Sequence, residues 1–143
     1  MVRVNFYDSI EDEKLDFAVI VARYKNQWVY CKHKDRDTFE VPGGHREIGE
    51  TIFETAKREL YEETGATEYD LRSICVYSVI RDEVNQMNQK ESFGALYFAE
   101  IKEFGKIPDF EMEKVELFDD PPKKLTYPEI QPKLIEKVIS LTR

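Results

Sequence analysis

Apolar residues recur along the chain in short runs that predict β-strands on both sides of one acidic helix. We expect strands at residues 2–7, 15–24, 28–34, 38–41, 71–81, 92–101 and 114–118. The segment 15–24 is β-branched and apolar over most of its length, which indicates a strand at the centre of a sheet. The polar turn 25–27 predicts that this strand continues into 28–34 as a hairpin. Trp28 would anchor that hairpin in the core, although an indole could also stack on a base.

The acidic helix carries its own start and stop signals. Thr51 and Glu54 have the spacing of a capping box, in which each side chain accepts a hydrogen bond from a backbone N–H at the helix start. Gly65 predicts the end, because glycine adopts the left-handed conformation after a last turn without steric strain. The helix is therefore expected to be about thirteen residues long, or roughly 20 Å.

The two faces of this helix differ in chemistry. An apolar stripe suited to packing on a sheet is formed by Phe53, Ala56 and Leu60. Glu59, Glu62 and Glu63 stand at i, i+3 and i+4, so their carboxylates crowd together near the helix C-terminus, where the dipole disfavours anions. Such a cluster of hard oxygen atoms suits a cation such as Mg²⁺ or Mn²⁺. The alternative is a solvated acidic face that Arg58 and Lys57 neutralise.

A second helix is predicted near the end of the chain. Pro128 or Pro132 would begin it, since proline is favoured in the first turn. Its expected apolar face comprises Leu134, Ile135, Val138, Ile139 and Leu141. Strands, the acidic helix, further strands and this helix together predict an α/β/α layered fold of the α/β class, with residues 1–143 as a single domain.

Composition and charge narrow the function classes. The 143 residues are 41% hydrophobic and carry a formal net charge of −8, from 21 basic and 29 acidic residues. This charge argues against a general binder of nucleic-acid polymers or of membrane surfaces. Cys31 and Cys75 lie far apart without CxxC spacing, so we expect two thiols rather than a disulfide. No apolar run reaches membrane-spanning length and residues 1–6 lack the apolar core of a signal peptide, so we expect a cytoplasmic protein.

The glycine-rich loop and the acidic helix together contain one motif in fixed register. Its members are Gly44, Glu50, Arg58, Glu59, Leu60, Glu62, Glu63 and Gly65. This pattern resembles the box of the Nudix hydrolase family, and the turn expected at Pro42-Gly43-Gly44 is also similar to that family. The single departure is Ala66, which is smaller than the usual Ile, Leu or Val and affects packing rather than chemistry. The resemblance implies a mixed sheet between helices.

The resemblance also implies a hydrolase that cleaves a nucleoside diphosphate linked to another moiety. Glu59, Glu62 and Glu63, joined by the backbone carbonyl of Gly44, would hold Mg²⁺ or Mn²⁺ ions that clamp the phosphates and lower the pKa of a bound water. Arg58 is expected to pair with a glutamate of the motif and hold it in position. Glu50 is expected to be hydrogen-bonded within the loop and helix start. The expected catalytic residues are therefore Arg58 and the three clustered glutamates.

Two further roles stay open in the sequence. The general base is either a glutamate of the motif or one from the acidic loop 108–113, Glu111 or Glu113, which could equally be ordinary solvated residues. Residues that could reach phosphates are Lys32, Lys34, Arg36 and Arg46, and the sequence does not rank them. His33 and His45 have no partner at metal-ligand spacing, so we expect them to be surface or packing residues.

The region downstream of the motif narrows the expected substrate. Residues 81–83 contain neither the proline of the family's ADP-ribose enzymes nor the tyrosine of its dinucleoside-polyphosphate enzymes. The compact chain and the segment 125–128 look more like the small nucleoside-triphosphate pyrophosphohydrolases, which include 8-oxo-dGTP diphosphatases. We therefore expect a (d)NTP, canonical or oxidised, to be cleaved to a nucleoside monophosphate and pyrophosphate by a monomer or homodimer. The alternatives are another nucleotide (ADP-ribose, a dinucleoside polyphosphate or a nucleotide sugar) and a non-catalytic nucleotide sensor.

Overall fold

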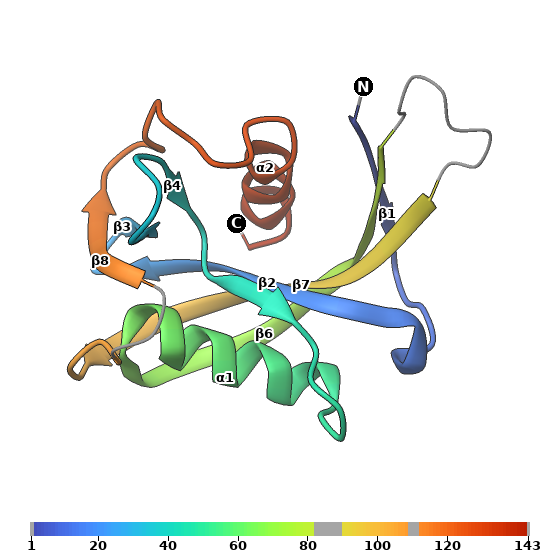
Figure 1. Ribbon diagram of the computed structural model, residues 1–143, viewed down its shortest axis with the longest axis horizontal. Helices are drawn as coiled ribbons and strands as arrows, with labels where there is room; N and C mark the ends of the chain where they lie inside the picture. The colour runs from blue at the N-terminus through green and yellow to red at the C-terminus, as the bar shows by residue number, and fades with distance from the viewer. Residues whose placement is uncertain (1, 82–89, 109–111, 143) are drawn as a thin grey trace.

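The computed structural model describes residues 2–81, 90–108 and 112–142. Within these ranges the chain forms eight strands and two α-helices (Figure 1). In chain order the elements are β1 (Val2–Tyr7), a 3₁₀ turn (Asp12–Lys14), β2 (Leu15–Tyr24), β3 (Gln27–His33), β4 (Phe39–Glu40), β5 (Gly43–His45), α1 (Ile52–Thr64), β6 (Ala66–Arg81), β7 (Lys90–Phe104), β8 (Met112–Phe118) and α2 (Gln131–Thr142). Most of the segment between the predicted strands 71–81 and 92–101 lies outside the described residues, and so does the candidate base Glu111.

The sheet is mixed, as predicted, and β2 lies inside it. Its strands follow the order β1-β6-β7-β2-β3-β4, with β5 paired to β2 and β8 paired to β3. β2 runs parallel to β7, whereas the other pairs are antiparallel. Long antiparallel pairing carries β6 and β7 beyond their predicted ends, so that β6 begins at Ala66 and β7 ends at Phe104.

The glycine-rich segment is a strand, and the prediction that it forms a turn was wrong. Gly43 and Gly44 pair with Val19 and Ala18 of β2. β3 pairs with β2 only at the far end, between residues 22–24 and 27–29. The start of β2 therefore has backbone groups that still need partners, and β5 supplies them. This pairing makes Gly43 and Gly44 part of the sheet, next to β2.

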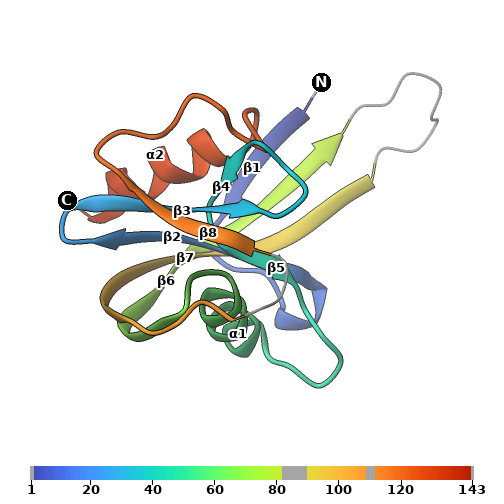
Figure 2. The ribbon, with the colours of Figure 1, turned by 60° about the vertical axis from the view of Figure 1, so that its left-hand side comes forward.

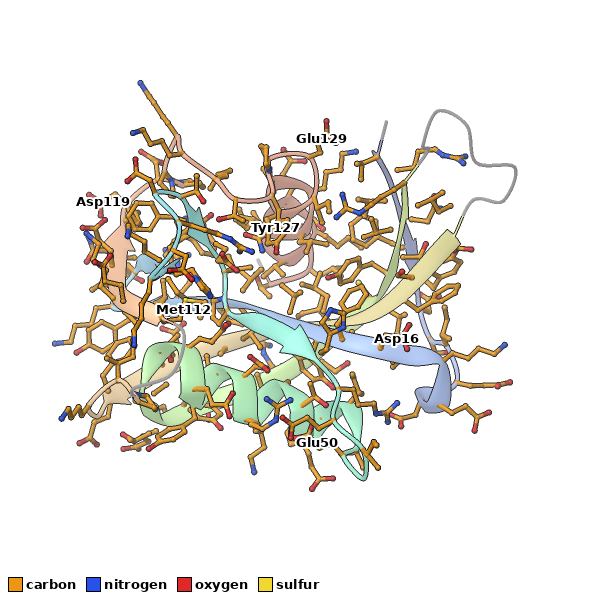
Figure 3. The ribbon with its side chains drawn as sticks, in the orientation of Figure 1. Asp16, Glu50, Met112, Asp119, Tyr127 and Glu129 are labelled. Atoms are coloured by element: carbon orange, nitrogen blue, oxygen red, sulfur yellow. The ribbon has the colours of Figure 1, made fainter. Side chains whose placement is uncertain are left out.

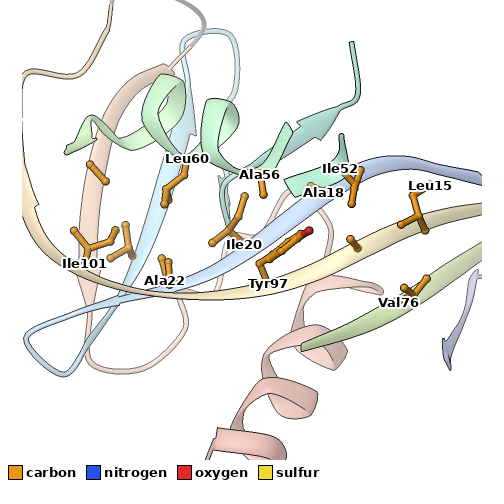
Figure 4. Packing of buried hydrophobic residues seen from close by; sticks show 14 residues of the cluster. Leu15, Ala18, Ile20, Ala22, Ile52, Ala56, Leu60, Val76, Tyr97 and Ile101 are labelled. Atoms are coloured by element: carbon orange, nitrogen blue, oxygen red, sulfur yellow. The ribbon is translucent and has the colours of Figure 1, made fainter. Parts of the chain in front are cut away.

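The two helices cover opposite faces of the sheet, which confirms the predicted α/β/α layers (Figures 1 and 2). Under α1, Ile52, Ala56 and Leu60 pack against the sheet in one buried cluster (Figure 4). Under α2, a second cluster contains Leu134, Ile135, Val138, Val21, Tyr30, Tyr77 and Leu96. Each face of the sheet thus has its own apolar core. Among the described residues, neither helix is long and apolar enough to cross a membrane.

Two residues predicted to be buried are exposed. Phe53 is 45% exposed, and Ile52 takes the inner position instead, because the buried stripe runs at i, i+4 and i+8 from Ile52. The Phe53 ring lies at the border of the helix, tilted against Tyr97 at a centroid distance of 5.9 Å. Leu141 is 54% exposed, since the last turn of α2 extends past the core.

Other predictions made from the pattern are confirmed. Thr51 and Glu54 form the capping box, and Gly65 ends α1 with φ of 76°. Trp28 is buried in the core of the hairpin. Cys31 and Cys75 are both buried free thiols. The helix therefore has the predicted length of 13 residues, which fixes the spacing of the acidic side chains along it.

Candidate active site

The centre of the acidic site is the contact between Glu59 on α1 and Gly44 on β5. A Cβ atom placed on Gly44 would lie 2.5 Å from the Glu59 Cδ and Oε1 atoms. Real Cβ atoms do not approach that closely, so any side chain at this position would displace the carboxylate. Gly44 is therefore required for close approach, and the Glu59 carboxylate rests directly on the backbone of β5.

Glu63 is fixed to the same strand. Its Oε1 accepts a hydrogen bond of 2.7 Å from the Gly43 backbone N–H, and the residue is only 7% exposed.

Cys31 lies next to these carboxylates. Burial raises the pKa of its thiol, and the charges of Glu63, Glu40 and Glu59 raise it further. Cys31 therefore stays protonated behind the acidic site.

Arg58 joins several carboxylates of the motif. Its Nη1 donates to Glu59 Oε1 at 2.6 Å and to Glu62 Oε2 at 3.2 Å. Its Nε donates to Glu50 Oε2 at 2.6 Å, and its Nη2 donates to the backbone carbonyl of His45 at 2.9 Å. These bonds, led by those to Glu50, raise the pKa of the guanidinium. The predicted pairing of Arg58 with motif glutamates is confirmed, and the arginine also ties α1 to β5.

Glu50 supports this arrangement from the loop before α1. Its Oε1 accepts hydrogen bonds from the Glu47 backbone N–H at 2.9 Å and from Thr55 Oγ1 at 3.0 Å. The hydrogen bond with Arg58 is the largest cause that lowers the pKa of Glu50 to about 2. The carboxylate is therefore ionised at any physiological pH, as expected for a residue that holds an arginine in place.

The donor set suits a hard divalent cation. Glu59, Glu62 and Glu63 offer carboxylate oxygens on one patch of α1, and the Glu59 carboxylate occupies the space that a side chain at Gly44 would need. Among the described residues, no three His, Cys, Asp or Glu side chains already converge on one point. Arg58 and the Gly43 N–H hold these oxygens in the present arrangement. Oxygen ligands of this kind are those that Mg²⁺ and Mn²⁺ prefer, so the residues fit the predicted cation in chemistry.

Two other candidate residues, Lys32 and Arg46, have structural partners of their own. Lys32 pairs with Glu113, whose side chain is 52% exposed on β8. Arg46 pairs with Asp12 and donates from Nε to the backbone carbonyl of Glu50 at 2.9 Å. These contacts assign Arg46 to fixing the loop before α1.

Arg36, another of the four basic residues considered for phosphate binding, contacts two residues that line a cavity. Its Nη1 donates to Glu40 Oε1 at 2.9 Å, and it also forms a hydrogen bond with Tyr127. Both Glu40 and Tyr127 line that cavity. Lys34 follows the end of β3 in a turn. His45 is on β5, and its ring packs edge to face with Phe17 at a centroid distance of 6.1 Å.

The cavity has a volume of about 610 Å³ and lies on the α2 side of the sheet. It is lined by Phe17, Val19, Glu40, Val41, Gly43, Gly44, His45, Tyr77, Val79, Arg81, Ser92, Tyr127, Ile130, Gln131 and Leu134. Figure 3 shows Tyr127 beside α2 and Glu50 beside α1, on opposite sides of the sheet. Because Gly43 and Gly44 also contact the glutamates of α1, β5 is the wall between the cavity and the acidic site.

The sequence named four basic residues that could reach phosphates, but it assigned none of the residues that line this cavity to substrate binding, so the cavity was not predicted. Its lining comes from strands and a helix far apart in the chain, which only the tertiary fold brings together. One signal was nevertheless present. Gln131 precedes Leu134, Ile135 and Val138 at helical spacing, so it is a polar residue at an apolar-face position.

The fold and the acidic site define a class of hydrolase. The profile of the NUDIX domain family matches residues 11–137, and the chain therefore belongs to this family. It is a Nudix hydrolase.

Individual relatives agree with this class. A Bacillus subtilis (strain 168) protein named "Putative 8-oxo-dGTP diphosphatase YtkD" is 32% identical over 126 residues, which span 87% of this chain and 75% of that protein. The crystal structure of the Bacillus subtilis pyrophosphohydrolase BsRppH has a TM-score of 0.78 at 27% identity and covers 97% of this chain and 90% of its own. The C. elegans Ap4A hydrolase shares the fold, with a TM-score of 0.64 at 17% identity over 90% of this chain and 99% of its own.

Proposed function

We propose that residues 1–143 form a single-domain, Mg²⁺- or Mn²⁺-dependent pyrophosphohydrolase that acts on small nucleotides in the cytoplasm. Its substrate is a nucleoside triphosphate, canonical or oxidised, which it cleaves to a nucleoside monophosphate and pyrophosphate. The contact between Glu59 and Gly44 carries this proposal, because the same glycine also lines the cavity. A nucleoside in the cavity would direct its phosphates across β5 to the acidic face of α1.

The cavity supports a nucleotide by its size and lining. Its volume of about 610 Å³ falls in the usual range of small-molecule sites. Phe17 and Tyr77 meet edge to face at a centroid distance of 5.5 Å and offer apolar surface to a base. Arg81 and Ser92, at the neighbouring ends of β6 and β7, add polar groups to the lining of the cavity.

The acidic patch needs a cation to accept a polyphosphate, because bare carboxylates would repel it. Glu59, Glu62 and Glu63, with the Gly44 carbonyl, are the residues that would hold the cation. A bound divalent ion supplies neutralising charge for the phosphates and lowers the pKa of a coordinated water. The name of the 32% identical relative, which refers to an 8-oxo-dGTP diphosphatase, supports a triphosphate as the substrate.

Arg58 is a positioning residue in this proposal. Its hydrogen bonds to Glu59 and Glu62 fix two of the carboxylates, and its bonds to Glu50 fix the guanidinium itself. Rigid placement matters because misplacing a reacting group by about 1 Å can lower the rate by roughly 100-fold.

We assign proton removal to a glutamate of the motif. Water attacks the α- or β-phosphorus atom, the glutamate takes a proton from that water, and the P–O bond between the α- and β-phosphates breaks, so that the nucleoside monophosphate and pyrophosphate separate. Glu113 is less suited to this role, because its ion pair with Lys32 lowers its pKa and its side chain is half exposed on β8. The side-chain exposures of Glu59 and Glu62 are 12% and 28%, so Glu62 is the more accessible of the two.

The experiment is phosphate and pyrophosphate release from a nucleotide panel, with and without Mg²⁺, at slightly alkaline pH. The panel contains canonical and oxidised (d)NTPs, ADP-ribose, a dinucleoside polyphosphate and a nucleotide sugar. We expect a nucleoside monophosphate and pyrophosphate from triphosphates, only in the presence of metal.

Glu62→Gln and Glu63→Gln should lower turnover by about 100-fold or more. Glu113→Gln, which removes a charge of the same kind outside the motif, should stay within about twofold of wild type. Turnover of triphosphates that is unaffected by chelation or by both motif variants would overturn the proposal. Release from ADP-ribose or a dinucleoside polyphosphate alone would overturn the assigned substrate.

A further inference from the structure

Gln131 is a buried polar residue on the apolar face of α2. It is only 5% exposed and precedes Leu134 and Ile135, which are buried in the core under this helix. Burying an amide in apolar surroundings is unfavourable unless its polar atoms find partners. The hydrogen bonds of this side chain therefore show what the position is used for.

One end of the Gln131 amide has a fixed partner. Its Oε1 accepts a hydrogen bond of 2.9 Å from the backbone N–H of Val41, the residue between β4 and Pro42. This bond sets the orientation of the amide, because only the oxygen end can accept from an N–H. The NH₂ end is then directed away from the backbone of Val41.

Gln131 belongs to the lining of the cavity. Gln131 lines it together with Ile130, Leu134 and Val41, whose side chains carry no polar atoms. In the part of the chain that the structure describes, Gln131 Nε2 donates no hydrogen bond. Tyr127, the next polar residue along this wall, already forms a hydrogen bond with Arg36. The amide thus presents two N–H donors to a ligand from an apolar wall.

We propose that Gln131 determines which purine base the cavity accepts, selecting a 6-keto purine over a 6-amino purine. This inference rests on the proposed function. Guanine and its oxidised forms carry a carbonyl oxygen at position 6, which accepts from an amide NH₂, whereas adenine carries a second donor there. A donor facing a donor leaves both groups unsatisfied in a buried site. Hydrogen-bond pairings of this kind discriminate between bases by roughly 10- to 100-fold.

The orientation of the amide allows a direct test, in which the donor that faces the cavity is replaced by an acceptor. In Gln131→Glu, one carboxylate oxygen can still accept from the Val41 N–H, and the other oxygen faces the cavity as an acceptor. This change should favour the 6-amino group of adenine. In Gln131→Met, the side chain keeps its length but offers no donor, so discrimination should disappear. Lys133→Gln makes the same change of net charge on an exposed position of α2 and serves as the matched control.

The experiment compares kcat/KM for GTP, ITP and ATP with Mg²⁺ at pH 8, together with equilibrium binding of GMP and AMP. ITP is included because its base has the 6-keto group of guanine but lacks the 2-amino group, so it tests the 6-position alone. We expect wild type and Lys133→Gln to prefer GTP and ITP over ATP by about 10-fold or more. Gln131→Met should bring the ratio near one, and Gln131→Glu should reverse it. Thermal unfolding of each variant establishes that it is folded.

Each outcome bears on the inference separately from the proposed function. A wild-type preference for ATP and AMP, or a preference for GTP that both Gln131 variants retain, would overturn the role of Gln131 while leaving the hydrolase intact. If no triphosphate is hydrolysed, the proposed function fails, but the binding ratio of GMP to AMP still tests Gln131. If no triphosphate is hydrolysed and neither monophosphate binds, both the proposed function and the role of Gln131 are overturned.

Discussion

Arg58 Nε donates a hydrogen bond of 2.6 Å to Glu50 Oε2, and this bond links the loop before α1 to the acidic face of the helix. The same guanidinium reaches Glu59 and Glu62, so Glu50 controls the position of two carboxylates that it does not touch. The pair therefore couples the stability of the loop to the geometry of the proposed cation site.

The first prediction concerns pH. The pKa of Glu50 is lowered from 4.5 to about 2 in the folded chain, mainly by its hydrogen bond with Arg58. A depressed carboxyl pKa stabilises the fold above the unfolded value, and this stabilisation is lost as the pH falls towards 2. We expect the Tm of wild type to fall over that window and that of Glu50→Gln to fall less steeply. Glu68→Gln, at an exposed site on β6, should behave like wild type, and equal slopes for all three proteins would contradict the role of the pair.

The second prediction concerns close packing at Gly44. Gly44→Ala places a methyl group 2.5 Å from the Glu59 carboxylate, which must move. We expect turnover of the best triphosphate to fall by about 100-fold with Tm altered much less. Gly105→Ala is the control, because its Cβ would meet the Thr67 Cγ2 atom at 2.9 Å and the Gly65 carbonyl oxygen at 3.6 Å, and no carboxylate of the motif. Unchanged turnover in Gly44→Ala would show that Glu59 need not sit on β5.

The third prediction concerns the core under α1. Leu60 is fully buried, so Leu60→Ala leaves a cavity and should lower the free energy of unfolding by about 2–5 kcal/mol in urea titrations. Leu141→Ala removes the same atoms from a side chain that is 54% exposed, and its effect should stay within about 0.5 kcal/mol. Similar losses for the two variants would contradict the packing described here.

The fourth prediction separates folding from cation binding. Arg58 and the Gly43 N–H already hold the glutamate oxygens, and both cores are apolar. Removing divalent ions with a chelator should therefore abolish hydrolysis while the far-UV circular dichroism spectrum and cooperative melting persist. A chain that unfolds on chelation would show that the cation is structural.

Features that depend on neighbouring residues were predicted better than features that depend on contacts between distant segments. The capping box at Thr51 and the glycine at 65 depend on neighbouring residues only, and both were correct. The strand at Gly43–His45 was missed because it exists only where β3 leaves part of β2 unpaired. Phe53 was misplaced because two candidate stripes, one starting at Phe53 and one at Ile52, fit the same spacing, and the sheet beneath the helix selects between them.

The same distinction applies to the site. The glutamates, Arg58 and Gly44 lie within one stretch of chain, so their neighbourhood followed from a motif. The cavity draws on β2, β4, β5, β6, β7 and α2, whose side chains meet only after the sheet has formed. Its one recognisable trace in the sequence was a glutamine at an apolar position of the last helix.

The placement of β5 has a consequence for how such proteins can diversify. Residues that would choose the substrate lie on one side of this three-residue strand, and residues that would cleave it lie on the other. Mutations in the wall formed by α2 can therefore accumulate without disturbing the carboxylates of α1. Proteins with this arrangement can therefore keep the same reaction while their substrates change.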